Sequence, residues 1–127
     1  MKIRVTEVLS IENPLRVGFQ TSVGSGVALW IGTPPTVGEV QDVEFELDEV
    51  FSLGKNLIPS SRNSPGINVI NGVTQIIAEI VENADEEWLA LKFEDSIIMI
   101  EVDDPLTERS GFVEMRTTKI RVYPTNI

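Results

Sequence analysis

Polar and apolar residues alternate with a period of two along most of this chain, which predicts β-strands. The clearest case is a segment in which Val43, Phe45 and Leu47 fall on one face and four acidic residues fall on the other. Such alternation is typical of a strand with one face on the core and one in solvent. Residues 97–100 are apolar at every position, so we expect a central strand that is covered on each side.

The pattern predicts an all-β fold of about eight strands with little or no helix, arranged as a single antiparallel barrel or sandwich. The expected strands span residues 2–9, 15–23, 27–31, 40–51, 72–82, 87–93, 97–102 and 112–123. We expect turns at the Gly24-Ser25-Gly26 triplet and at Glu94-Asp95-Ser96, and one long loop over residues 52–66. Residues 2–5 (Lys-Ile-Arg-Val) are echoed by residues 119–122, which favours neighbouring strands with one basic face. The whole chain, residues 1–127, is expected to form one β domain.

Composition removes several kinds of chemistry. The chain has no cysteine and no histidine, so it lacks disulfides, thiolate nucleophiles, the commonest general base and the commonest transition-metal ligand. We therefore expect no enzymatic activity and no cofactor. The lack of cysteine favours a reducing, cytoplasmic location. No segment resembles a signal peptide or a membrane span, so we expect no membrane contact.

Charge is unevenly distributed along the chain, which carries a net charge of −10. Residues 67–108 hold eleven acidic residues and one lysine, and residues 38–50 hold six acidic residues and no basic one. Phosphate contacts require Lys and Arg, so direct binding to a nucleic-acid backbone is disfavoured. A basic protein partner is electrostatically easier to bind. The oligomeric state stays open.

The segment from residue 72 to residue 127 resembles a small closed barrel of the oligonucleotide/oligosaccharide-binding (OB) type. The resemblance rests on a long strand that follows Gly72, two short strands joined as a hairpin (88–93 and 97–102) and a closing strand introduced by Gly111-Phe112-Val113-Glu114. It implies an OB-like C-terminal half that binds a ligand. The acidity of the segment and its few aromatic residues argue against a nucleic-acid ligand.

The whole chain also resembles, in size and charge, bacterial immunity proteins and other inhibitors of basic nucleases. We therefore expect a non-catalytic, acidic protein-binding module that neutralises a basic partner. The alternative is a structural or ligand-binding β-barrel, such as an assembly subunit, that uses its 52–66 loop.

The acidic ladder formed by Asp42, Glu44, Glu46 and Asp48 is the first candidate binding site. Residues two apart on a strand lie about 6.8 Å apart on one face, so the ladder could imitate a phosphate backbone. The alternative is a solvated face whose charges are paired by a neighbouring strand that carries basic residues.

Three further groups of residues are candidates for binding. Lys55 and Arg62 lie in the 52–66 loop, where they could contact a partner. For Trp88, as for Trp30, core packing is the default, and an exposed tryptophan beside the 52–66 loop would instead mark a binding hot spot. The carboxylates of Glu101, Asp103 and Asp104 are candidate ligands for a hard cation, although their spacing matches no EF-hand loop and favours an acidic turn.

Overall fold

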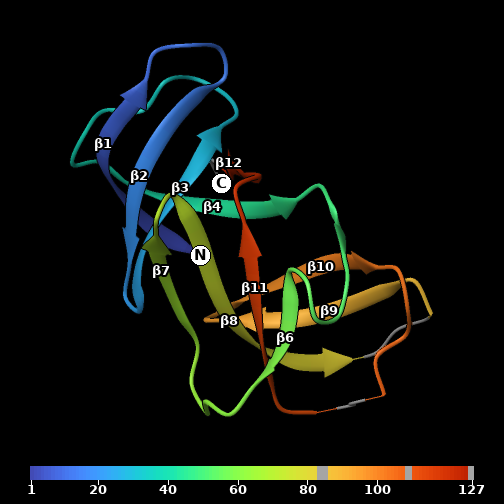
Figure 1. Cartoon of the computed structure of the whole chain (residues 1–127). Coiled ribbons are helices and arrows are strands. Elements are labelled where there is room, and N and C mark those ends of the chain that lie inside the picture. Colours follow the sequence, from blue (N-terminus) through green and yellow to red (C-terminus); the bar gives the residue numbers. More distant parts are fainter. Residues whose placement is uncertain (83–85, 108–109, 126–127) are drawn as a thin grey trace.

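The computed structural model describes residues 1–82, 86–107 and 110–125, and within these ranges the protein is all-β (Figure 1). No helix occurs there, so none in these ranges is long and apolar enough to cross a membrane. The described ranges contain twelve strands, more than the eight expected, because two expected strands are divided and two more lie outside the expected set. The strands are β1 (Lys2–Ser10), β2 (Leu15–Thr21), β3 (Gly24–Trp30), β4 (Val40–Leu47), β5 (Val50–Phe51), β6 (Leu57–Ser60), β7 (Gly66–Ile70), β8 (Val73–Glu82), β9 (Trp88–Phe93), β10 (Ser96–Val102), β11 (Phe112–Thr117) and β12 (Ile120–Pro124).

Five of these strands form a closed barrel in the upper part of Figure 1. Strands β1, β2 and β3 make an antiparallel meander, and β4 pairs with the start of β1. Strand β12 closes the barrel because it pairs antiparallel with β4 and parallel with β3. The barrel is compatible with the OB type, but its position differs from our expectation. Of the strands in residues 72–127, only β12 belongs to it.

Six of the seven remaining strands form a curved sheet in the order β6–β11–β8–β9–β10–β5. The long strand β8 pairs with β11 along one edge, and along its other edge it pairs first with β7 and then with β9. The sheet joins the barrel where β7 meets β3 through the parallel pair Gly24 and Ile67. In Figure 1 this second sheet occupies the lower part of the molecule.

One hydrophobic core runs through the barrel and the second sheet. Phe45 of β4 shows how they are connected: its ring lies edge-on to Phe19 of the barrel, with centroids 5.4 Å apart, and stacks on Phe93 of β9 at 6.2 Å. Trp30 is buried in the same core, as expected. The apolar faces of the two parts therefore cover each other.

The Gly24-Ser25-Gly26 triplet lies inside strand β3, so the turn expected there was wrong. The turn is at Ser22 and Val23, where the Thr21 hydroxyl accepts a hydrogen bond from the Val23 amide at 3.0 Å. Gly24 and Gly26 instead allow neighbouring groups to lie close to the backbone of β3. A Cβ on Gly24 would lie 1.8 Å from the Ile67 carbonyl oxygen, and one on Gly26 would lie 2.6 Å from the Phe19 ring.

The expected strands over residues 40–51 and 112–123 are each two strands. The first segment breaks after Leu47, and the second breaks after Thr117. The two breaks are adjacent, because the Thr117 hydroxyl donates a hydrogen bond to the Glu49 carboxylate. Both segments therefore leave one sheet and enter the other at the same place.

The loop expected over residues 52–66 is not one loop. Strand β6 lies within it and pairs with β11, and β7 begins at Gly66. Strand β7 then turns into β8 through Asn71 and Gly72, which both have positive φ, at 52° and 77°. An Asn-Gly pair is the preferred sequence for such a two-residue hairpin turn.

The basic segments at 2–5 and 119–122 do not lie on neighbouring strands. Strand β4 lies between β1 and β12, so the two basic segments flank the acidic ladder.

Candidate functional site

The acidic ladder lies on the outer face of the barrel. Its four members are exposed, whereas Val43 and Leu47, which alternate with them on β4, are buried. Both neighbouring strands place cations beside the ladder. Arg121 Nη1 lies 3.5 Å from Glu46 Oε1 and 3.4 Å from Asp48 Oδ2.

At the other end of the ladder, Lys2 on β1 is the register partner of Asp42. The ion pairs of Arg121 are the kind of charge pairing that a solvated face would have. Exposed ion pairs of this kind contribute only about 0–1 kcal/mol to stability.

A second exposed surface lies on β9, β10 and β5, where we expected the apolar run of residues 97–100 to be covered on each side. That expectation was wrong: Ile97 is 56% exposed and Met99 is 44% exposed. The alternate residues Ile98 and Ile100 are buried in the core. Core packing was also the wrong default for Trp88, which is 39% exposed.

The register of the strands places these side chains on one face. Glu101 of β10 pairs with Trp88 of β9 on one side and with Val50 of β5 on the other. Met99 and Ile97 follow on the same face of β10 at steps of two residues. Val50 is 46% exposed. We call the surface formed by Val50, Trp88, Ile97 and Met99 the outer hairpin face.

Acidic residues border the outer hairpin face at one end. Because the start of β9 pairs with the end of β10, the residues that precede β9 and those that follow β10 lie at the same end of the sheet. They include four exposed carboxylates, those of Glu86, Glu87, Asp103 and Asp104. An apolar centre with a polar border is the usual anatomy of a protein interface.

The candidate cation ligands Glu101, Asp103 and Asp104 lie at this border. The Asp103 carboxylate accepts a hydrogen bond from the Ser52 hydroxyl at 2.5 Å, which directs it toward the connection between β5 and β6. Within the described ranges, no group of three or more acidic side chains is arranged to hold a metal ion.

The two candidate cations of the 52–66 segment lie on different connections. Lys55 is exposed in the turn between β5 and β6. Arg62 lies between β6 and β7 and lines a hollow of about 240 Å³ together with Gln75 and Glu114. The hollow that Arg62 lines does not include Lys55.

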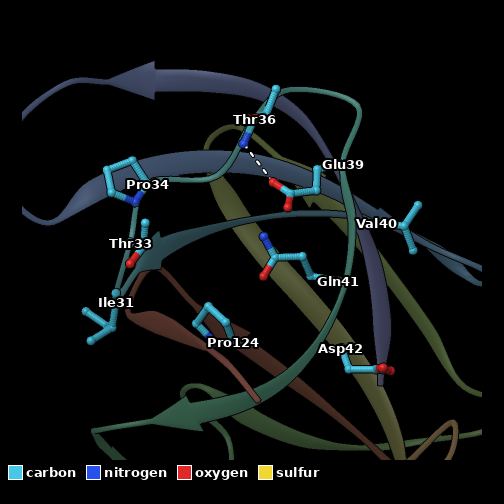
Figure 2. Close-up of a pocket in the computed structure, with 10 residues that line it drawn as sticks. Ile31, Thr33, Pro34, Thr36, Glu39, Val40, Gln41, Asp42 and Pro124 are labelled. Atoms are coloured by element: carbon cyan, nitrogen blue, oxygen red, sulfur yellow. Dashed lines mark hydrogen bonds between the residues drawn. The ribbon is translucent and has the colours of Figure 1, made fainter. Parts of the chain in front are cut away.

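A larger hollow, of about 720 Å³, lies at one end of the barrel beneath the connection between β3 and β4 (Figure 2). We call it the barrel-mouth hollow. Sequence reasoning did not identify it. The signal in the sequence is Gln41, a polar residue at the first inward-facing position of β4, where the later inward positions are apolar. Its lining is formed by Ile31, Gly32, Thr33, Pro34, Thr36, Glu39, Val40, Gln41, Asp42 and Pro124.

Comparison of the chain with protein-family models, with curated proteins and with solved structures finds no match.

Proposed function

We propose that this protein is a non-catalytic binding module for a basic protein partner, and that the outer hairpin face is its contact surface. The single observation that carries the proposal is that this face exposes four large apolar side chains from three strands. Contiguous exposed apolar surface of this kind commonly marks an interaction site. Trp and Met are also enriched at protein interfaces.

The charges around the face support a basic partner. Four exposed carboxylates gather at one end, and Glu101 lies among the apolar residues. The one lysine on these strands, Lys92, lies in register between Glu79 of β8 and Ile97 of β10. A surface of this charge attracts a basic protein and repels an acidic one.

The barrel supports a binding role in a second way. We infer that it is of the OB type, because five strands close in the order β1–β2–β3–β12–β4. Barrels of this type are binding scaffolds. An immunity-type role, in which the partner is a basic toxin, fits the proposal.

The proposal is tested by capture of the partner from a lysate of the cells that produce the protein. The test variant is Ile97→Lys, which puts a charge into the outer hairpin face. The matched control is Val37→Lys, because Val37 is 55% exposed, almost as much as Ile97, but lies between β3 and β4. We expect a basic protein to be retained by the wild type and by the control, and to be lost from the test variant.

Two further experiments vary the salt concentration and the charge of the acidic ladder. Retention should fall as salt rises, since exposed charges are screened. Equal retention by the wild type and Ile97→Lys, or retention that salt does not change, would contradict the proposal. A variant in which all four ladder carboxylates become amides shows whether the ladder contributes: unchanged retention would mean that the outer hairpin face is sufficient.

A further inference from the structure

The barrel-mouth hollow has the size of a ligand site and is partly open to solvent. Its volume of about 720 Å³ falls within the range of about 300–1,000 Å³ that is typical of small-molecule sites. Figure 2 shows the connection between β3 and β4 arching over it, with Glu39 and Gln41 on one side and Ile31 and Pro124 on another. The mouth of a β-barrel is a common place for such a site.

The connection that covers the hollow is held at several points. The Trp30 indole Nε1 donates a hydrogen bond to the Thr33 carbonyl at 2.8 Å, and the Thr36 amide donates one to Glu39 Oε2 at 2.9 Å. Gly38 and Val5 are joined by a further backbone hydrogen bond, from the Gly38 amide to the Val5 carbonyl at 2.7 Å. A ligand would therefore meet a site whose shape exists before binding, which lowers the entropic cost of binding.

The lining chemistry selects the kind of ligand. The described residues that line the hollow include no Lys or Arg. They include the Glu39 carboxylate, the Gln41 amide and the carboxylate of the ladder residue Asp42, whose register partner is Lys2. The nearby cation Arg4 directs its Nη1 to the Gly38 carbonyl at 2.9 Å. The hollow therefore offers hydrogen-bond acceptors and negative charge, which disfavour an anion.

The apolar part of the lining further limits the chemical classes of ligand that fit the hollow. Ile31, Pro34 and Pro124 contribute carbon surface beside these acceptors. A long alkyl stem that ends in a cationic group matches such a surface, because the stem packs on carbon and the head reaches the acceptors. A guanidinium group adds a planar set of donors that suits carboxylate oxygens.

We propose that the barrel-mouth hollow is a binding site for an alkyl-guanidinium group, with Glu39 as its main acceptor. The group is either that of free arginine or that of an arginine side chain presented by a protein. This site is separate from the outer hairpin face and does not rest on the function proposed for that face.

The test uses ¹H–¹⁵N NMR titration of the whole chain with N-acetyl-L-arginine amide. The chain has two tryptophans, so it has two indole N–H signals. The signal of Trp30 reports on the connection over the hollow, because that N–H bonds to Thr33. The signal of Trp88, on the second sheet, is the internal control. We expect a saturable shift of the Trp30 signal and no shift of the Trp88 signal.

Two comparisons decide whether the charge matters. N-acetyl-L-citrulline amide has nearly the same shape without the charge, and we expect it to bind at least about tenfold more weakly, since charge-assisted hydrogen bonds are the stronger ones. Glu39→Gln should weaken the arginine probe by a similar factor while its amide oxygen still accepts from Thr36. The matched control is Glu44→Gln, which removes the same charge from a ladder residue outside the lining, and it should bind like the wild type.

Free L-arginine separates the two sources of the group: tighter binding of the blocked probe identifies a protein side chain, and tighter binding of free arginine identifies the metabolite. The proposal is overturned if the Trp30 signal shows no saturable shift, if citrulline binds as well as arginine, or if Glu39→Gln and Glu44→Gln behave alike. A dispersed spectrum of each variant shows that it is folded.

Discussion

Replacement of Gly24 by alanine should disrupt the junction between the barrel and the second sheet. Gly24 has φ of +139° and is the β3 residue that pairs with Ile67 of β7. The added Cβ would lie 1.8 Å from the Ile67 carbonyl oxygen, and this atom belongs to the backbone and cannot rotate away. Strands β3 and β7 must therefore move apart if the residue is to fit.

The cost of Gly24→Ala has three parts. The left-handed backbone conformation costs a residue with a Cβ about 1–2 kcal/mol. Forced displacement of packed groups costs about 1–3 kcal/mol. Loss of the hydrogen bond from the Ile67 amide to the Val23 carbonyl, at 3.3 Å, adds about 0.5–1.5 kcal/mol. We therefore expect the free energy of unfolding to fall by about 3–6 kcal/mol, a large share of the stability of a typical domain.

Urea unfolding followed by tryptophan fluorescence measures this loss. The matched control is Gly54→Ala: Gly54 also has positive φ, at +86°, but nothing lies within 4 Å of its added Cβ. The control should lose only the conformational part, about 1–2 kcal/mol. If the two variants lose the same free energy, close approach of β7 is not the reason for glycine at position 24.

Two other predictions concern the outer hairpin face and the acidic ladder. Ile98→Ala should lower the free energy of unfolding by about 2–5 kcal/mol, because Ile98 is buried, whereas Ile97→Ala should lower it by less than about 1 kcal/mol. Equal losses in urea unfolding would mean that the side chain of Ile97 is packed as Ile98 is. Arg121→Gln removes both ion pairs to Glu46 and Asp48 and should lower the free energy of unfolding by about 0.2–1 kcal/mol, with a smaller effect at high salt. A larger loss that salt leaves unchanged would show that the ladder is held by more than surface charge.

The alternation of polar and apolar residues predicted the strands well, because this alternation depends only on the residues of each strand. The β9–β10 hairpin, the exposure of the ladder and the all-β class all follow from period-two patterns and turn residues. Closure of the barrel could not be predicted in this way. Strand β12 pairs with β3 and β4, strands that lie more than 70 residues earlier in the chain, and no local feature indicates which strands will meet.

The candidate sites show a second limit of sequence reasoning. An apolar residue such as Ile97 predicts that a surface will be covered, but the sequence does not say whether this chain or another molecule covers it. A glycine is ambiguous in a similar way, because it serves both turns and close backbone approach. Gly24 was expected in a turn and lies instead against Ile67.

The adjacent breaks at Glu49 and Thr117 have a consequence for the order in which the protein folds. Between them the chain builds the second sheet, and only then does β12 return to complete the barrel. The entropic cost of closing so long a loop falls when the segment in between is already compact. We therefore expect the second sheet to form early and the barrel to close late, with β3 and β4 presenting unpaired edges until β12 arrives. We expect folding by this route to be slow for a chain of this size, because β12 pairs with strands that lie far from it in the sequence.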